Sequence, residues 1–230
     1  MQLSTLDHNT VQQIGKQILN TYRNHCSSFE DASQRLVKDV FASFQSSQKE
    51  PEFALLRVFR TLTFEQLTPE LQTIAPSKTE QYLTLMGTVG LEEAWCDRHQ
   101  SKSRKAIQIN QNMSPMFKGI FRELGFSWDD STGDELVSGE SLGAMSMIRY
   151  FYVEDVSSST YITDQKTFVK PYGIQSVIAA GSRFITGGAY VVIGFTTVPV
   201  TREQAEILVQ LTPHISTLLA IFDAQGALWS

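Results

Sequence analysis

The chain has 230 residues, of which 42% are hydrophobic and 19% are charged, and a formal net charge of -5. This composition excludes an intrinsically disordered chain, and the acidic balance gives no support to nucleic-acid binding. Two cysteines, Cys26 and Cys96, are too few for a disulfide framework. Because we find no signal peptide and no apolar run near the ~20 residues that span a bilayer, we expect a cytoplasmic protein without a membrane segment.

Two amphipathic helices are expected at the start of the chain. Residues 10–24 carry a narrow apolar stripe at helical spacing, which is typical of a coiled-coil seam or of a helix on a domain surface. Residues 29–44 form the second helix, and the polar residues 46–51 follow as a linker. We therefore expect residues 1–45 to be an N-terminal helical extension and residues 46–230 to be the main domain.

The middle of the chain alternates strands with short helical segments. Apolar patterning predicts strands at residues 53–62 and 82–86, with a short helix between them. A further helix is expected over residues 114–124. Residues 127–143 combine carboxylates and glycines with little periodicity, which is typical of a long functional or mobile loop.

A hairpin follows in the last third of the chain. Residues 148–153 predict an aromatic strand, and residues 163–168 predict a short helix. Two nearly continuous apolar runs, 174–185 and 189–198, flank Gly187-Gly188. This pattern predicts two strands that are covered on both faces and joined by a two-residue turn with positive φ.

The last helix begins after Thr201, where Gln204 completes a Thr-x-x-Gln capping box. One of its faces is apolar over residues 207–222. The order of all these elements predicts an α+β fold, with a central antiparallel β-sheet of about five to six strands flanked by helices.

Three stretches carry a resemblance to a known family. They are Phe168-Val-Lys-Pro-Tyr-Gly-Ile-Gln-Ser-Val177, the glycine hairpin followed by Val198-Pro-Val-Thr-Arg-Glu-Gln-Ala-Glu206, and Leu85-Met-Gly-Thr-Val-Gly-Leu-Glu-Glu-Ala-Trp-Cys-Asp-Arg98. With the element order, they resemble the GAF domain of the PAS/GAF superfamily over roughly residues 30–223. Such regions occur in bacterial histidine kinases and cyclic-dinucleotide signalling proteins. The resemblance implies a bacterial sensory domain and does not specify its ligand.

One group of candidate ligand contacts lies in a basic segment. Trp95 would be a stacking wall, and Arg98 and His99 would hold an anionic or planar ligand. Further cations follow closely, namely Lys102, Arg104 and Lys105. Two alternatives stay open for this segment, an electrostatic patch for a phosphate or an acidic partner and a solvated polar loop.

A second group of candidate contacts is aromatic. Tyr150 and Tyr152 share one face of a strand, and Ser176 lies in the following strand, so their hydroxyl groups would line a pocket. Phe168 and Tyr172 complete the group. The alternative is ordinary core packing with the phenol groups at the rim.

No catalytic or metal-binding pattern is visible. The chain lacks a nucleophile elbow, a P-loop, a dinucleotide fingerprint and a calcium loop, and its histidines and cysteines do not stand at metal-ligand spacing. Haem ligation by His99 or His214 and bilin attachment to Cys96 are weaker alternatives. The family resembled also has an enzymatic branch that reduces free methionine sulfoxide with clustered cysteines, which two distant cysteines do not match. We therefore expect no catalytic residues and no enzyme activity, and the cofactor is unknown.

The leading hypothesis is a non-catalytic signal-sensing module that binds a small ligand between the sheet and residues 87–143. Its signal would leave through the terminal helices, residues 10–24 and 201–223, which would bundle in a homodimer. The receiving partner would be a kinase or a cyclic-dinucleotide enzyme. The alternatives are a protein-interaction or scaffold domain with a filled pocket, and a haem-based gas or redox sensor.

Overall fold

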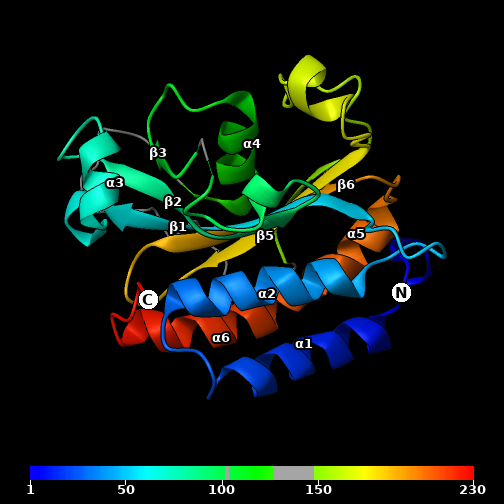
Figure 1. Cartoon of the computed structure of the whole chain (residues 1–230), viewed down its shortest axis with the longest axis horizontal. Coiled ribbons are helices and arrows are strands. Elements are labelled where there is room, and N and C mark those ends of the chain that lie inside the picture. The colour runs from blue at the N-terminus through cyan, green and yellow to red at the C-terminus, as the bar shows by residue number, and fades with distance from the viewer. Residues whose placement is uncertain (102–103, 127–147) are drawn as a thin grey trace.

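The computed structural model describes residues 1–101, 104–126 and 148–230, and the loop expected at 127–143 lies outside them. Its centre is a six-stranded antiparallel sheet with the strand order β3-β2-β1-β6-β5-β4 (Figure 1). Helices cover both faces of this sheet. The predicted α+β class, with a central antiparallel sheet flanked by helices, is confirmed.

The strands are longest at the centre of the sheet. They are β1 (Phe53–Thr63), β2 (Gln81–Gly90), β3 (Ala106–Gln108), β4 (Tyr150–Val153), β5 (Ser176–Arg183) and β6 (Ala189–Thr196). The predicted end of β2 at Met86 was too early, because pairing with β1 continues to Gly90 opposite Leu55. The edge strand β3 was not predicted as a strand, since three residues are too few to show an alternating pattern.

Six α-helices lie in the described residues. They are α1 (His8–Tyr22), α2 (Phe29–Ser43), α3 (Pro69–Ile74), α4 (Pro115–Leu124), α5 (Arg202–Leu208) and α6 (Thr212–Ala224). Short 3₁₀ segments are η1 (Leu3–Thr5), η2 (Phe64–Gln66), η3 (Glu93–Trp95) and η5 (Val209–Leu211), and a π-helical turn is η4 (Gln165–Val169). The predicted capping box of Thr201 and Gln204 is confirmed at the start of α5.

Two local predictions were wrong in detail. The single terminal helix is divided by η5, because Pro213 has no N–H to donate to a carbonyl of the preceding turn. The β5–β6 hairpin has a longer loop than the two-residue turn that was expected. Its strands pair as far as Arg183 and Ala189, and the positive φ angles of Gly187 (91°) and Gly188 (76°) lie within the loop between them.

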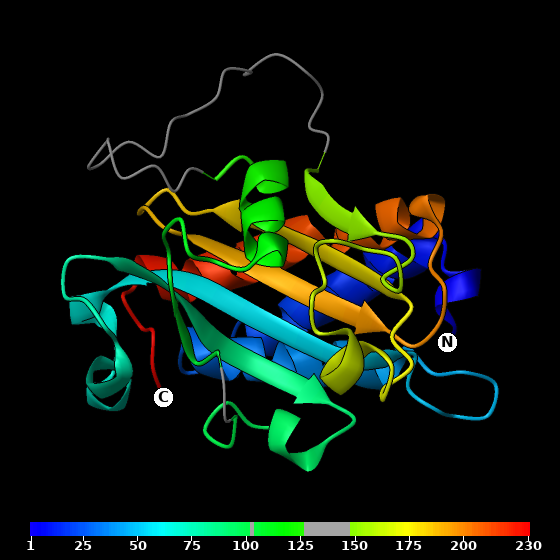
Figure 2. The ribbon, with the colours of Figure 1, turned by 90° about the horizontal axis from the view of Figure 1, so that it is seen from above.

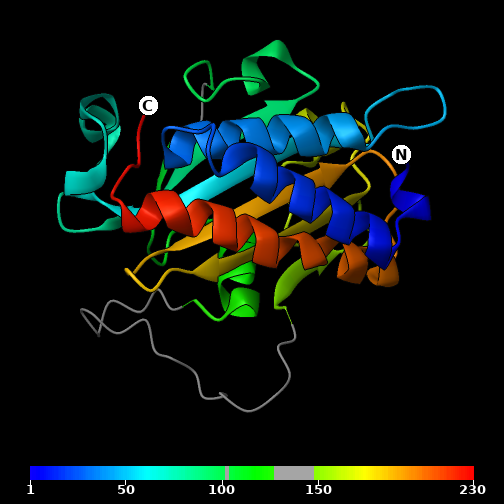
Figure 3. The ribbon, with the colours of Figure 1, turned by 90° about the horizontal axis from the view of Figure 1, so that it is seen from below.

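Two hydrophobic clusters lie on opposite faces of the sheet. On one face, α2 and α6 pack side by side against the strands, and α1 lies over them on the side away from the sheet (Figures 1 and 3). On the other face, α4 stands over β5 and β4, and the segment around η4 also covers the sheet (Figure 2). The two faces are called here the helical face and the α4 face.

The N-terminal helix uses its apolar stripe inside the same chain. Val11, Ile18 and Tyr22 are buried in the cluster of the helical face, and α1 contacts α6 and η5. The stripe that suggested a homodimer seam is therefore already covered, and the homodimer stays a prediction without this support. The expected boundary between residues 1–45 and 46–230 also stays a prediction, since residues on both sides of it share one hydrophobic cluster.

One apolar stretch is longer than inspection of the sequence suggested. Arg202–Ala224, which comprises α5, η5 and α6, is long and apolar enough to cross a membrane by length and composition alone. In the structure, 56% of its most apolar window is buried inside the fold. Core helices of globular domains pass the same test, and this stretch packs against the sheet as such a helix does.

An ion pair inside the helical face joins β1 to α6. Arg60 is 4% exposed, and its Nε donates to a carboxylate oxygen of Asp223 at 2.8 Å. The Arg60 guanidinium also donates to the Thr61 carbonyl and lies near the rings of Phe29 and Phe184. The charge is thus neutralised within the core.

We predict that Asp223→Ala lowers the free energy of unfolding by about 3–5 kcal/mol, because the Arg60 guanidinium would stay buried without its counter-charge. Urea denaturation of the purified chain measures this loss. The matched control is Glu123→Ala, which removes one partner of an exposed ion pair with Arg122 and should change little. A loss for Asp223→Ala no larger than that of the control would show that the buried pair does not stabilise the fold.

A second prediction concerns the close approach of α2 to β2. A Cβ atom on Gly87 would lie 2.6 Å from the backbone of Ser33, so Gly87→Ala should push the helix from the strand and lower stability by about 1–3 kcal/mol. The matched control is Ser33→Ala, which removes a buried hydroxyl without a hydrogen-bond partner in the described residues and should be neutral or stabilising. Thermal unfolding of both variants decides, and an unchanged Tm for Gly87→Ala would contradict this packing.

Candidate ligand-binding site

A cavity of about 210 Å³ lies on the α4 face of the sheet. Its floor comes from the two central strands, with Leu55, Arg57 and Phe59 on β1 and Ile193 and Phe195 on β6. Its walls come from three separate segments, and they include Trp95 of η3, Met116 and Phe117 of α4, and Phe168 of η4. Arg104, Asp164 and Thr167 add polar groups, and each of these three residues is exposed.

Arg57 is the one charged side chain on the floor of this cavity. It is 7% exposed, although it stands at the centre of the sheet between Thr88 of β2 and Ile193 of β6. The pleat of β1 aims it at the cavity, on the same face as Leu55 and Phe59. Its Nε is buried without a hydrogen-bond partner in the described part of the chain.

The electrostatic surroundings of Arg57 are unfavourable for a cation. Burial, and after it the nearby charge of Arg104, lowers the pKa of the Arg57 guanidinium to about 10. Both causes act in the same direction, since desolvation and a like charge each disfavour the protonated form. Within the described ranges, no carboxylate lies within ion-pair distance of Arg57 or Arg104.

An aromatic group forms one wall of the cavity. The Trp95 ring packs against Phe168 with 5.7 Å between ring centroids and against Tyr172 with 4.5 Å. Phe168 in turn meets Phe195 of the floor edge-on at 5.0 Å. The structure therefore brings together Trp95, Phe168 and Tyr172, three of the side chains predicted from the sequence. Two of them, Trp95 and Phe168, line the cavity directly.

The basic residues of the predicted site lie elsewhere. Arg98 is buried and pairs with Glu30 of α2, while its guanidinium lies 4.8 Å from the centre of the Trp229 ring. His99 is more than half exposed, and its Nε2 lies 3.4 Å from the Glu30 carboxylate. Arg98 and His99 do not line this cavity with Trp95, because η3 ends at Trp95 and the chain then turns towards α2. Their role in ligand binding stays a prediction.

The tyrosines and the serine of the predicted site face the helical side of the sheet. Tyr150 donates to Glu206 of α5 at 3.0 Å, and Tyr152 donates to the Val200 carbonyl. Burial raises the pKa of Tyr152 to about 12, so its phenol stays protonated and acts as a donor. Ser176 is fully buried and donates to the Glu154 carbonyl at 2.7 Å. None of Tyr150, Tyr152 and Ser176 lines the cavity on the α4 face.

Sequence reasoning missed Arg57 and did not single out Arg104. Arg57 lies inside the apolar run Phe53-Ala-Leu-Leu-Arg-Val-Phe59, where a cation among the apolar residues of a predicted strand was a usable signal. Arg104 belongs to the segment that was predicted to be basic and exposed. It is exposed in the structure, yet its guanidinium lies 5.9 Å from the centre of the Phe117 ring at the cavity.

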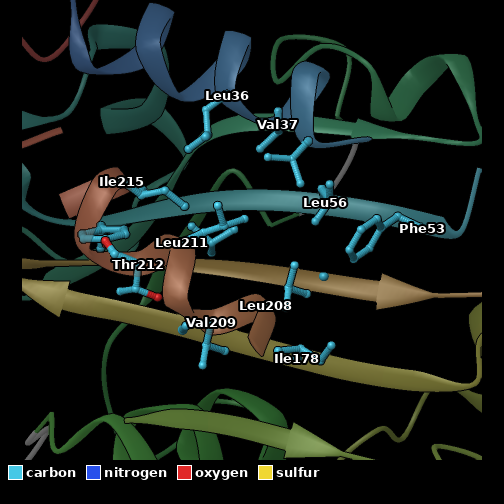
Figure 4. Close-up of a pocket in the computed structure, with 15 residues that line it drawn as sticks. Leu36, Val37, Phe53, Leu56, Ile178, Leu208, Val209, Leu211, Thr212 and Ile215 are labelled. Carbon is cyan, nitrogen blue, oxygen red and sulfur yellow. The ribbon is translucent and has the colours of Figure 1, made fainter. Parts of the chain in front are cut away.

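Two other cavities are weaker candidates. One of about 60 Å³ lies on the helical face, between side chains of β1, β5, α2 and the C-terminal helices, such as Leu36, Phe53, Ile178 and Leu208 (Figure 4). Its lining is almost wholly apolar, so a ligand would find few groups there to fix its orientation. The other, of about 280 Å³, is lined by Arg60 and Asp223, whose charges already neutralise each other.

The histidines and cysteines do not converge on the cavity. His99 and His214 are absent from its lining, which removes the motivation for the haem alternative. No group of three or more His, Cys, Asp or Glu side chains at metal-binding distance occurs in the described residues. Burial raises the pKa of the Cys26 thiol to about 11, so this cysteine is a poor nucleophile near neutral pH.

Comparison with known proteins gives a likeness in structure only. No family model matches the sequence, and no curated protein matches it. Among solved structures, a free methionine-R-sulfoxide reductase from Neisseria meningitidis in complex with its substrate has a TM-score of 0.56 at 8% identity, over 96% of this chain and 95% of that chain. The GAF domain of a phosphoenolpyruvate-protein phosphotransferase from Coxiella burnetii has a TM-score of 0.53 at 12% identity, over 97% of this chain and 100% of that chain. The nlh2 GAF domain from A. Aeolicus, in an inactive state, has a TM-score of 0.51 at 12% identity, over 94% of this chain and 98% of that chain.

These structures correct one expectation. The prediction that the chain is not an enzyme was wrong. It rested on missing sequence motifs, whereas structures similar to this chain include free methionine-R-sulfoxide reductases. The missing sequence motifs therefore did not exclude catalysis. At identities of 8–12%, the likeness establishes the shared architecture and not a shared activity.

The matches extend over nearly the whole chain and include GAF domains from different proteins. They agree with the six-stranded antiparallel sheet and its flanking helices. The chain has a GAF-like fold.

Proposed function

We propose that the chain is a sensory module that binds a small molecule in the cavity on the α4 face. The observation that carries this proposal is the buried guanidinium of Arg57, which faces a cavity with aromatic walls and has no partner in the described residues. Pockets that combine apolar walls with a few placed polar groups are the usual form of small-molecule sites. The scaffold alternative required a pocket filled by Phe and Tyr, and the open cavity favours ligand binding over it.

A route for a signal starts at the cavity wall. Trp95 lines the cavity, and its backbone carbonyl accepts a hydrogen bond from Thr88 at 2.9 Å. The adjacent Cys96 carbonyl accepts from Gln34 of α2 at 3.3 Å, and Arg98 pairs with Glu30 of the same helix. A ligand that moves Trp95 would therefore act on α2 through a short, hydrogen-bonded segment.

The same segment reaches the C-terminal residues. Trp229 lies over Arg98, and the backbone N–H of Ser230 donates to the Glu30 carboxylate at 3.1 Å. The N–H groups of Phe29 and Glu30 donate to carbonyls of residues 227 and 228. These contacts support a signal that leaves through α2 and the C-terminal segment after α6. Free Cys26 and Cys96 fit the proposed cytoplasmic location.

Ligand-dependent thermal stabilisation tests the proposal. A screen of small metabolites should contain compounds that raise Tm, since a ligand at ~100 times its Kd stabilises the folded state by about 2.7 kcal/mol. We predict that Trp95→Ala reduces or removes this shift, because it deletes a wall of the cavity. The matched control is Tyr150→Ala, an aromatic truncation on the helical face, which should retain the shift.

A ligand-dependent rise in Tm that is lost in Tyr150→Ala and retained in Trp95→Ala would locate binding on the helical face and contradict the proposal. Turnover of any stabilising compound is assayed in the same samples, since the fold is shared with enzymes. Conversion of the bound compound would identify the module as an enzyme and overturn the sensory proposal.

A further inference from the structure

The chain contains two buried arginines in one strand, and only one of them is neutralised within the described residues. Arg57 and Arg60 are 7% and 4% exposed, and both belong to β1. Arg60 pairs with Asp223 on the helical face, whereas Arg57 has no ion pair in the part of the chain that the structure describes. The fold therefore supplies a counter-charge on one face of the sheet and leaves the other cation facing a cavity.

An isolated cation in a protein interior is strongly unfavourable. Removing it from water costs several kcal/mol unless an opposite charge lies close by and its donors are bonded. The surroundings of Arg57 add to this cost, because Phe59, Ile193 and Phe195 are apolar and Arg104 carries the same sign. Natural proteins keep such a group where it serves binding or catalysis at the expense of stability.

The acidic side chain among the residues that line the cavity does not replace the missing charge. Asp164 is exposed, and its carboxylate accepts a hydrogen bond from Thr167. It forms no ion pair with Arg57 or Arg104, and it is not among the charges that act on Arg57. The cavity thus has the Arg57 cation on its floor and a second cation, Arg104, in its exposed part. Its acidic group, Asp164, is already hydrogen-bonded to Thr167.

We infer that the cavity takes a small organic anion, whose carboxylate or phosphate group binds the Arg57 guanidinium while its apolar part contacts Trp95 and Phe168. This inference rests on the proposed function. A guanidinium is suited to the role, because its planar donors match the oxygens of a carboxylate or phosphate in pairs. Arg104 adds attraction from the exposed part of the cavity, and the volume of about 210 Å³ favours a ligand below drug size.

Three probes that each carry one phenyl ring test the charge of the ligand, and two of them, benzoate and benzamide, have nearly the same shape. Benzoate, phenyl phosphate and the neutral benzamide are titrated against the full chain in a low-chloride buffer, by calorimetry and by thermal shift. We predict that one of the two anions binds at least about tenfold more tightly than benzamide. The anion that binds more tightly shows whether the natural ligand carries a carboxylate or a phosphate group. Arg57→Gln should remove this preference, and Arg57→Lys should retain part of it. Arg35→Gln, which changes an exposed arginine on α2, is the matched control and should bind like the wild type.

The outcomes separate this inference from the proposed function. Benzamide that binds as tightly as both anions would overturn the anion assignment and leave a ligand-binding cavity intact. Arg57→Gln that keeps the full preference would also overturn it. Binding of none of the three probes up to about 10 mM would count against the cavity as a ligand site altogether.

A second experiment tests the same inference without a ligand. Arg57→Met replaces the guanidinium by an apolar side chain, so it should raise the Tm of the ligand-free protein by about 2–4 °C or more. The same variant should not respond to either anion. A fall in Tm of that size would show that a group of the chain itself neutralises Arg57, and it would overturn the proposal.

Discussion

The pleat of strand β1 is the constraint on which the two faces of this molecule depend. Residues 57 and 60 are three positions apart, so a regular strand sends their side chains to opposite faces of the sheet. On the helical face, Arg60 meets Asp223 and ties the central strand to the last helix. On the α4 face, Arg57 meets a cavity. One strand thereby supplies both a completed ion pair and a charge without a counter-charge in the described residues.

The helical face and the α4 face also differ in the segments that cover them. The helical face is closed by long helices, with α2 and α6 on the sheet and α1 over them, and its apolar void is small. The α4 face is covered by shorter and more separate segments, including α4, η3 and η4. A site built from several such segments on a rigid sheet is the usual arrangement for binding groups in proteins.

Local signals in the sequence predicted much of the fold. The helix predicted at residues 29–44, the strand predicted from Phe53 and the capping box at Thr201 each depend on neighbouring residues, and each is confirmed, with the helix ending at Ser43. Trp95 and Phe168 were both predicted as ligand contacts, although they lie far apart in the sequence. Their shared contact depends on the fold, which the resemblance to GAF domains supplied.

The directions and partners of the side chains at the candidate site could not be predicted from local patterns. Alternation showed that Tyr150 and Tyr152 share a face, but it did not show that this face is turned to α5. The run of cations after Trp95 looked like one functional cluster, yet a single turn directs Arg98 to Glu30 and leaves Trp95 at the cavity. A cation in an apolar strand could be seen in the sequence, but only the folded state shows that Arg60 has Asp223 as its partner and that Arg57 has no partner in the described residues. The enzyme question was misjudged because a fold can host catalysis without a familiar motif.

The central claim is that Arg57 holds an anion in the cavity on the α4 face, and native mass spectrometry of freshly purified protein tests it most directly. The wild type and Arg57→Met are each weighed under native and denaturing conditions. The account predicts a small additional mass on the native wild type, released on denaturation as an organic acid or phosphate ester, and no such mass on Arg57→Met. The same retained mass on both proteins, or release of a neutral compound, would contradict it.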